Sequence, residues 1–595
     1  MDHTPMRGDG KASSMKDNQE YFDAEKDVPQ TGASTESSQL DGPFAGPQGA
    51  QYAPRTHKFW LIMCCNFLTL FLVALDRTII STAIPRITDE FNSLGDIGWY
   101  SSAYMLTGAC SQPVFGRIYK FYDMKRNFLT AVIIFDIGSA VCGAVPTSNT
   151  FIAGRAIAGF ASAGIFSGCM LITIPLVPLH KRPMFQSMFG AVFGIPSVLG
   201  PLVGGAFTSN VTWRWCFYIN LPIGAVSWAS MALVWYPEKI ARNPIPIGQH
   251  IRRLDPLGML FFASSMVCLL LALQWGGTTY SWKDGRIIAL FVVFGVLFLA
   301  FAIVQVLTPG TATIPARVVT QRSIFCGSFY IFFIASSMMT IIYYIPIWCK
   351  TPAQTEQVPM LNSETVQTVK LVNPVDSGVY TLPLVLSLTV GSFCGGGITQ
   401  KIGYYVPMMY ACPAIMSIGV GLMSTFNVDT GSSLWIGYQF LSGFDLGLGM
   451  QITGILVQRV LPGPDIPIGI SLMFLLQQLG GSIFTVVSQS ILNNILVSRL
   501  VGIPGLDTGQ VINEGATHLE SVVPHAYIGM VKEVYNYALT RIFLMSMGLP
   551  LAALISSLGT EWMSLKKGKN GQDGPEASTR TGVASEYSES GQVST

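Results

Sequence analysis

Fourteen long apolar runs follow one another along the chain, and this series limits the fold more than any other feature of the sequence. A helix that crosses a bilayer needs about 20 mostly apolar residues. Only 11% of the 595 residues are charged, whereas a soluble domain has about 25%, so the bilayer is the natural solvent for this surface. The runs lack the alternation of a β-barrel and therefore predict helices. The expected spans are 59–82, 98–116, 128–146, 151–174, 187–208, 217–236, 256–274, 286–308, 324–347, 377–398, 405–425, 433–456, 467–491 and 539–559.

The composition and the missing motifs exclude several classes of protein. A net charge of +2 provides no basic field for nucleic acid. The 11 Cys are scattered, mostly in apolar runs, without a CxxC pair, which argues against disulfides and bound metal. The sequence has no Walker A motif, no HExxH motif and no cluster of His, Cys or Ser with paired acids. We therefore expect no enzyme activity, no cofactor and no metal.

Two polar segments flank the apolar part of the chain. Residues 1–55 and 561–595 are poor in branched apolar residues, so we predict that both are disordered. If the N-terminus is cytoplasmic, Lys and Arg are roughly twice as frequent on the inner side as on the outer side, as the positive-inside rule requires. An even number of spans places both termini on one side. We therefore expect both tails in the cytoplasm.

Five charged residues fall well inside the predicted spans, at Asp76, Arg77, Asp136, Arg155 and Asp445. A charge at the centre of a membrane helix costs at least about 2.5–3.5 kcal/mol, so each one needs a partner, a cavity or a task. Asp76 and Arg155 both lie a few residues below the outer surface and can pair if their helices touch. Such a pair suits proton coupling, because desolvation and a nearby guanidinium act on the carboxylate in opposite directions. The alternative is a static pair that locks two helices together.

The remaining charges each have two interpretations. Arg77 either acts near the membrane face or extends its side chain to the surface. Asp136 is either a second proton site or, as we favour, a hydrogen-bonded contact between helices. Asp445 lies in a Gly-rich segment and either lines a cavity in the second half or packs between helices. Polar side chains inside the spans add further candidates for the cavity, namely Tyr343, Tyr344, Gln451, Gln477 and Gln478.

The stretch GIPSVLGPLVGGAF at 194–207 contains an unusual density of Gly and Pro for a helix. Gly200, Gly204 and Gly205 recur at about one helical turn, which lets a second helix approach closely. Pro196 and Pro201 permit a bend. The segment therefore predicts either a pivot between two packed arrangements or a static packing face, and the residues alone leave both open.

Several motifs, taken in order, resemble the fourteen-helix branch of the drug:proton antiporters in the major facilitator superfamily. LDRTIISTAIPRI at 75–87 resembles the first-helix signature, and RAIAGFASAG at 155–164 resembles the fourth-helix motif, with Ala158 where a Gln is usual. GIPSVLGPLVGGAF resembles the antiporter motif of the fifth helix, and WRWCFYINLPIG at 213–224 the entry of the sixth. DSGVYTLPL, GYYVPMMY and DIPIGISLMFLLQQLGGSI in the second half resemble fungal members, which include pumps for toxins and other secondary metabolites.

This resemblance implies an all-α membrane protein with the major facilitator fold. Its 14 transmembrane helices would form a first six-helix bundle at 56–236, an inner linker with two inserted helices at 237–323, and a second six-helix bundle at 324–560. The family also implies that the bundles rock around a midplane cavity. Asp76 and Arg155 would couple this motion to protons, and the segment from Pro196 to Gly205 would be the pivot.

The loop after the second helix departs from the family pattern. The family usually has G-x-L-A-D-x-x-G-R-K, whereas this chain has GRIYKFYDMKRNF. Gly116 matches, but Lys120 stands in place of the Asp and Asp123 in place of the second Gly. That Asp helps to close the inner gate in the family, so we expect a different closure here. Asp123, Lys125 and Arg126 are the candidates.

The sequence thus predicts a proton-coupled antiporter that exports small, largely apolar organic compounds. We expect a monomer in the plasma membrane, with a vacuolar or vesicle membrane as the alternative. The expected partners are a small-molecule substrate, protons and the lipid bilayer, with the proton gradient as the driving force. A proton-coupled uptake carrier, for example for a siderophore, is the first alternative function, and a membrane sensor without transport is the second.

Overall fold

The computed structural model describes residues 56–91, 93, 96–236, 253–277, 280–308, 310–350, 381–428, 430–501 and 527–566. The predicted disorder of residues 1–55 lies outside this part of the chain, and so do most of the tail at 561–595 and most of the inner linker. Each of the fourteen predicted spans coincides with helix, and the described ranges contain no strand. The long helices are α2 (His57–Phe91), α3 (Ile97–Phe121), α4 (Met124–Ala144), α5 (Ser148–Leu176), α6 (Arg182–Asn210), α8 (Asn220–Val234), α10 (Pro256–Trp275), α11 (Gly285–Leu307), α13 (Arg322–Lys350), α15 (Leu382–Ile402), α16 (Val406–Met423), α17 (Ser432–Gly449), α18 (Ile452–Val460), α19 (Ile466–Leu500) and α22 (Ile528–Ser557).

Thirteen of the described helical segments are long and apolar enough to cross a membrane. The remaining predicted span, 98–116, corresponds to α3, whose 25 residues are also long enough at about 1.5 Å per residue. This helix is more polar because it lies between α5 and α19, where Ser111 and Gln112 are buried in protein. The structure is consistent with fourteen spans and shows an all-α membrane protein.

Two helices extend beyond their apolar runs, so the segment 492–538 between the last two predicted spans is helical at both of its ends. α19 continues to Leu500 and α22 already begins at Ile528. The added part of α19 is amphipathic, with Leu492, Leu496 and Leu500 buried at intervals of four residues. A hydropathy window reads such a segment as polar, although one face of it packs against the protein.

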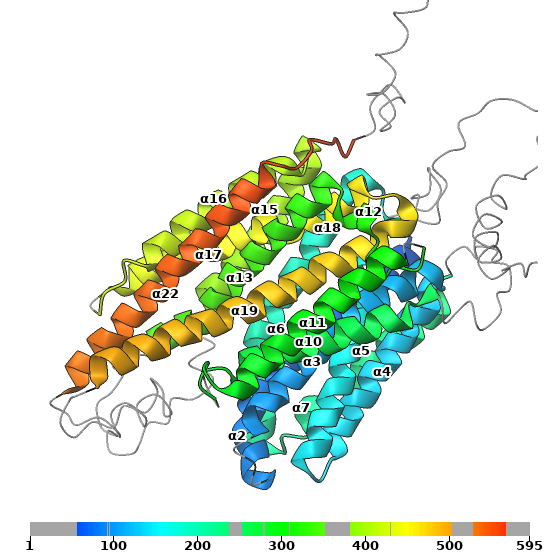
Figure 1. The fold of residues 1–595 in the computed structure, drawn as a ribbon. Coiled ribbons are helices and arrows are strands. Elements are labelled where there is room, and N and C mark those ends of the chain that lie inside the picture. Colours follow the sequence, from blue (N-terminus) through cyan, green and yellow to red (C-terminus); the bar gives the residue numbers. More distant parts are fainter. Residues whose placement is uncertain are drawn as a thin grey trace, which may run out of the picture. The chain divides into compact units, whose positions relative to one another are not determined.

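The helices pack in two sets, which Figure 1 shows in blue to cyan and in green to red; α10 and α11, also green, belong to neither set. In the first set, α5 packs on α3 and α4, and α2 packs on α6 and α8. In the second set, α15 packs on α17, α13 on α19 and α22, and α16 on α17 and α22. The two sets meet along α3 and α19 and along α6 and α15. We call the sets the first half and the second half; the domain boundaries given above stay predictions.

The two inserted helices lie beside the place where the halves meet. α10 contacts α3 and α19 as well as α11. α11 has only two buried side chains, Ile287 and Phe301, and exposes most of its apolar surface. An apolar helix of this kind fits a position against lipid.

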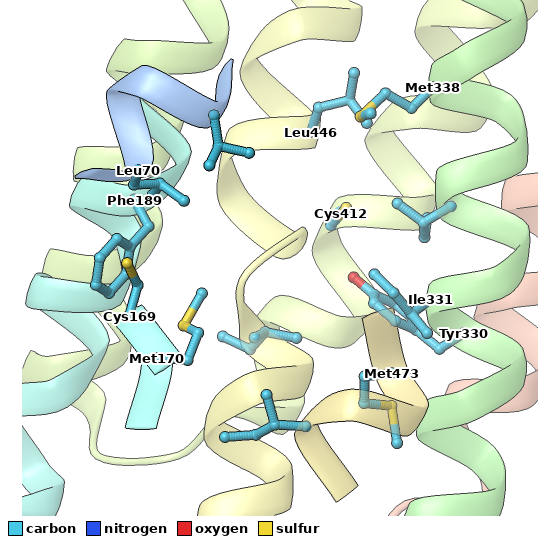
Figure 2. Packing of buried hydrophobic residues seen from close by; sticks show 14 of the residues in the cluster. Leu70, Cys169, Met170, Phe189, Tyr330, Ile331, Met338, Cys412, Leu446 and Met473 are labelled. Carbon is cyan, nitrogen blue, oxygen red and sulfur yellow. The ribbon is translucent and has the colours of Figure 1, made fainter. Parts of the chain in front are cut away.

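The buried apolar core continues from one half into the other (Figure 2). Leu70 and Phe189 belong to it in the first half, and Tyr330 and Leu446 in the second. Across the boundary, the rings of Phe166 on α5 and Phe474 on α19 meet edge to face with centroids 4.1 Å apart, and both pack against this core. The halves are therefore in direct van der Waals contact.

The predicted antiporter motif on α6 packs closely, as expected, but within the first half. α6 continues as one helix through Pro196 and Pro201. The carbonyl of Pro196 accepts a hydrogen bond of 2.9 Å from the Thr78 hydroxyl of α2. Gly200 and Gly204 lie so near α2 that a Cβ at either position would overlap its atoms. These glycines therefore join two helices of the same half.

The contact of α6 with the second half lies nearer the start of the helix. A Cβ on Gly190 would meet Ser392 of α15, and a Cβ on Gly194 would meet Thr389. Gly205 has no neighbouring atom within 4 Å of such a Cβ. The predicted close approach of a second helix is therefore confirmed for Gly200 and Gly204, with α2 as that helix, but not for Gly205. The role of the segment as a pivot stays a prediction.

Candidate functional site

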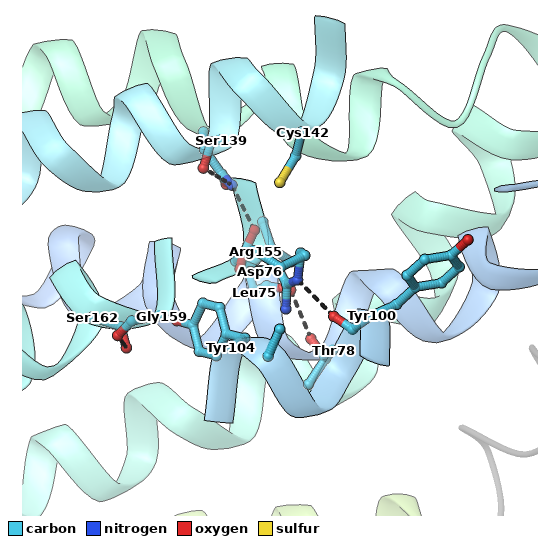
Figure 3. Close-up of polar contacts among 12 residues, drawn as sticks. Leu75, Asp76, Thr78, Tyr100, Tyr104, Ser139, Cys142, Arg155, Gly159 and Ser162 are labelled. Carbon is cyan, nitrogen blue, oxygen red and sulfur yellow. Dashed lines mark hydrogen bonds and ion pairs between the residues drawn. The ribbon is translucent and has the colours of Figure 1, made fainter. Parts of the chain in front are cut away.

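The sequence predicts that Asp76 and Arg155 pair if their helices touch. In the structure they form a buried ion pair (Figure 3). Asp76 lies on α2 and Arg155 on α5, and the Arg155 Nη1 is 2.5 Å from the Asp76 Oδ2. Both side chains are almost completely buried, with exposures of 0% and 1%. The other carboxylate oxygen accepts a hydrogen bond of 3.2 Å from the Asn220 amide on α8. Three helices of the first half thus meet at this carboxylate.

The guanidinium of Arg155 is held from several sides. Its Nε donates to the backbone carbonyl of Tyr100 at 3.0 Å, and the group lies over the Tyr104 ring, 4.5 Å from the centroid. Asn220 in turn donates to the Ser139 hydroxyl at 3.2 Å. An ion pair in a region of low dielectric needs such additional hydrogen bonds to offset the cost of desolvation. Both members of the ion pair are therefore held in place by further hydrogen bonds.

Asp136 does not line the cavity. It lies on α4, one helical turn before Ser139, and faces α8 where Gly224 leaves room for its carboxylate. Its Oδ1 is buried and has no hydrogen-bond partner among the described residues. The interpretation as a contact between α4 and α8 fits this position, but the hydrogen bond that it assumed is not present at Oδ1.

Asp445 is also absent from the cavity wall. The residue lies inside the second half on α17 with 0% exposure. Neither carboxylate oxygen has a hydrogen-bond partner in the described part of the chain. Tyr330 and Cys412 are close enough to interact electrostatically with it. Of the two interpretations of Asp445, packing between helices fits this position and lining of the described cavity does not, because α17 turns this face into the bundle.

A cavity of about 310 Å³ lies between the two halves and α10. Its wall comes from α2, α3, α10, α13 and α19, at the end of the molecule where α10 leads into α11. Of the predicted cavity residues, Tyr343, Gln477 and Gln478 line it. Cavities of this size hold small organic ligands.

Two other predicted cavity residues lie elsewhere. Tyr344 points away from the cavity and is buried; its hydroxyl donates to the Gln489 side chain at 3.2 Å. Gln451 lies between α17 and α18, close to Gly190 of α6. Tyr344 packs into the buried apolar core, whereas Tyr343 lies on the cavity side of α13, and this difference explains the first error.

Most of the polar wall of the cavity was not predicted from the sequence. Arg77 lines the cavity, so its interpretation as a surface-seeking side chain is wrong. α19 contributes a continuous polar stripe, which consists of Gln478, Ser482, Thr485, Gln489 and Asn493. Their spacing of three or four residues places them on one face of a helix. This periodicity was the signal that could have identified the stripe from the sequence.

The halves are in close contact at the opposite end of α3 and α19. Gly116 of α3 lies against Ser471 of α19, and a Cβ on this glycine would overlap the serine side chain. The Lys120 ammonium is 2.7 Å from the Asp465 carboxylate of the second half. Arg317 reaches the same carboxylate oxygen at 3.1 Å. The position at which the family has an Asp therefore holds a lysine, and the acid is in the other half.

Asp123, Lys125 and Arg126 were the candidates for closing the inner gate. Their described contacts lie within the first half instead. The Asp123 carboxylate accepts a hydrogen bond of 2.9 Å from the backbone of Arg126 and so caps α4. The Lys125 ammonium donates to the Ala232 carbonyl of α8 at 2.7 Å. Arg117, which was not predicted, donates to the Thr311 carbonyl at 2.8 Å, in the segment that follows α11. Of the five residues predicted for this loop, Gly116 and Lys120 are the two with a described contact to the second half.

These features define a class of protein. Two helical halves enclose a cavity that approaches one end, are packed tightly together at the other end, and hold a buried ion pair beside the cavity. This is the geometry of a membrane transporter that works by alternating access.

Comparison with known proteins identifies the family. The family described as "Major Facilitator Superfamily" matches residues 67–485, and the chain belongs to it. The protein is similar to the "MFS-type efflux pump MFS1" of Arthroderma benhamiae, with 45% identity over 86% of this chain and 92% of that protein. It is 43% identical to the "Efflux pump aflT" of Aspergillus parasiticus, over 86% of this chain and 97% of that protein. The "Rubrofusarin-specific efflux pump aurT" of Gibberella zeae is also 43% identical, over 86% of this chain and 91% of that protein.

A solved structure has the same fold. The proton:xylose symporter XylE gives a TM-score of 0.53 at 12% identity, over 85% of this chain and 97% of that one. At this identity the likeness concerns the fold alone. The resemblance found in the motifs and the prediction of a transporter rather than an enzyme are thus confirmed.

Proposed function

We propose that this protein is a proton-coupled antiporter that exports small, largely apolar organic compounds. The observation that carries the proposal is the buried Asp76–Arg155 pair directly behind the cavity wall, since the next residue of α2, Arg77, lines the cavity. The names of the relatives, which are efflux pumps, support the direction of transport. The substrate is a small molecule, the driving force is the proton gradient, and no cofactor takes part.

The charge distribution in the loops supports the orientation. With both termini in the cytoplasm, the end that is closed by Lys120 and Asp465 faces the cytoplasm, and the cavity approaches the outer surface. The described arrangement is then the state from which substrate leaves the cell and a proton enters the protein. We place the protein as a monomer in the plasma membrane of a fungus.

Protonation of Asp76 removes the negative charge that faces Arg155. Removing one partner of a buried ion pair costs about 3–5 kcal/mol, because the other charge stays buried. If the inward-facing state shields Arg155 better, an energy of this size shifts the ratio of the two states by roughly a hundredfold to a few thousandfold. Coupling follows when proton and substrate prefer different states.

The experiment is transport into inside-out vesicles with an acidic lumen, which mimics the outside of the cell. The probes are the methyl ester of naphthoic acid and the methyl ether of lawsone, a hydroxynaphthoquinone. We expect uptake with the wild type that disappears when the pH gradient is collapsed. The Asp76→Asn variant is expected to reach the membrane and to lose this pH-driven uptake.

The matched control is Asp89→Asn, a charge-neutralising change at an exposed position of the same helix. It is expected to transport like the wild type. Normal pH-driven transport by Asp76→Asn would refute the assignment, and probe accumulation from the lumen toward the medium would indicate uptake into the cell instead of export.

A further inference from the structure

Arg77 is a cation in the cavity wall without an anionic partner. The four ion pairs found among the described residues do not include it. Its Nε is buried and makes no hydrogen bond to any described residue. The neighbouring acid, Asp76, points to Arg155 instead. An unpaired guanidinium at this depth is costly, so it needs a partner that this structure does not supply.

The surroundings of Arg77 are aromatic. Its guanidinium lies over the Tyr104 ring, 5.5 Å from the centroid. Tyr343, on the opposite side of the boundary between the halves, is near enough to interact with it electrostatically and also lines the cavity. Tyr104 is buried behind the wall and does not line the cavity, so a planar group that binds to this guanidinium would lie beside the Tyr343 ring of the second half.

The rest of the polar wall offers amides and hydroxyls but no acid. The described lining residues include no Asp, Glu, Lys or His, so Arg77 is the sole charged group among them. Gln477 and Gln478 have no hydrogen-bond partner among the described residues, unlike Gln489, which is bonded to Asn493 at 3.0 Å. Two free amides and one free guanidinium present more donors than acceptors. The wall is thus suited to a ligand rich in acceptor oxygens.

We propose that the cavity binds aromatic organic anions, namely carboxylates and acidic phenols or enols, with the anionic oxygens on the Arg77 guanidinium. This inference rests on the proposed function, in which the cavity holds the exported compound. A cationic amphiphile is disfavoured because the wall offers no described carboxylate to balance its charge, while Arg77 repels it. Planar bidentate recognition of an oxyanion is the task to which arginine is best suited.

An anionic substrate changes the charge that moves during transport. An anion that leaves the cell while a proton enters carries one more elementary charge across the membrane than a neutral compound exchanged for the same number of protons. Export of the anion is therefore expected to respond more steeply to an imposed membrane potential than export of its neutral derivative.

The test is binding to the purified full-length protein in nanodiscs, measured by quenching of tryptophan fluorescence. The probes are two matched pairs: naphthoic acid with its methyl ester, and lawsone, an enolate at neutral pH, with its methyl ether. For the wild type we expect each anion to bind about tenfold or more tightly than its neutral derivative, as a charge-assisted contact predicts. Arg77→Gln is expected to remove this ratio, and Arg77→Lys to restore part of it.

The control variant is Arg286→Gln, which removes an exposed guanidinium that is not part of the cavity wall. It is expected to keep the wild-type ratio. The proposal is overturned if neither anion binds more tightly than its neutral derivative, or if Arg77→Gln leaves the ratio unchanged. Failure of proton coupling would appear separately, as pH-driven transport that survives Asp76→Asn.

Discussion

Asp76 in the first half and Asp445 in the second half are both completely buried, but only Asp76 has described polar partners. Asp76 in the first half has an arginine at 2.5 Å and an amide at 3.2 Å. Asp445 in the second half has no hydrogen-bond partner among the described residues and lies near Tyr330 and Cys412. Burial is the same, 0% in both cases, so the neighbours alone distinguish the two acids.

The difference shows what a buried acid can do in a membrane protein. An ionised carboxylate without a partner is too costly in an apolar interior, so such a group is carried as the neutral acid. A carboxylate that faces a fixed guanidinium is stable with its charge. Only the second arrangement changes the electrostatic balance of its surroundings when a proton arrives, which favours the first half as the place of coupling.

The largest effect is expected from Arg155→Met, which leaves Asp76 buried without its partner. The protein should lose about 3–5 kcal/mol of stability, seen as a lower melting temperature in detergent. Combining this change with Asp76→Asn should recover part of the loss, because the pair is then removed as a whole. Arg286→Met, at an exposed position, should leave melting unchanged. Equal melting of Arg155→Met and the wild type would mean that the pair contributes nothing to stability.

A smaller effect is expected where the halves meet, from Lys120→Ala. Of the two described ion pairs of Asp465, the one with the largely exposed Arg317 then remains, and loss of a charged hydrogen bond costs roughly 1.5–3 kcal/mol. The state with the cytoplasmic end open should become more populated. In a cysteine-free background, a cysteine introduced at Ser471 should then react about tenfold faster with an impermeant maleimide added from the cytoplasmic side.

Lys125→Ala is the matched control for this experiment, since Lys125 binds a carbonyl of its own half. It should leave the labelling rate of the Ser471 position unchanged. Equal labelling in the wild type and the Lys120→Ala variant would show that the ion pair does not hold this end closed.

Asp445→Asn should change stability by less than about 1 kcal/mol, because the amide replaces a neutral acid of the same shape. The measurement is again the melting temperature, beside Asp76→Asn. A loss as large as that of Arg155→Met would contradict the comparison, since it would mean that Asp445 is buried with its charge and has a strong partner.

The smallest effect concerns Glu90, an exposed acid on the same helix as Asp76 but beyond its apolar part, which ends at Ile80. Hydrogen bonds from Arg214 and Trp213 lower the pKa of Glu90 below its ordinary value of 4.5. Its contribution to stability is therefore present above pH 4.5 and is lost as the pH falls through the lowered pKa. Because the pair is exposed, the contribution is under about 1 kcal/mol. Glu90→Gln should melt slightly below the wild type at neutral pH and equally in acid.

The fold was largely predictable because a bilayer requires long apolar helices, and such runs are visible one by one. The error occurs where a helix is buried in protein rather than lipid. The end of α19 was expected to be a loop, because only one of its faces is apolar. The environment of this segment depends on neighbours that are distant in the sequence.

The candidate site was predictable only in part. Asp76 and Arg155 stood out because a charge in a membrane helix demands a partner. Tyr343 and Arg77 face the cavity, whereas Tyr344 and Asp445 do not. This difference depends on the rotation of each helix about its own axis, which a single sequence does not determine. The stripe on α19 could have been found, since Gln478, Gln489 and their neighbours follow helical spacing.

The separation along α19 between Asp465, which closes one end, and Gln477, which lines the cavity, has a consequence for leakage. Twelve residues of helix span roughly 18 Å, and Phe474 meets Phe166 within this length. The contacts of Lys120 with Asp465, Gly116 with Ser471 and Phe166 with Phe474 are thus spread over more than half the thickness of the hydrocarbon core of a bilayer, which measures about 30 Å. Rotation of a single side chain cannot separate contacts that are spread over this length. Even brief passage of a proton to the cytoplasm then requires the whole rigid-body movement, which protects the pH gradient of the cell when no compound is available for export.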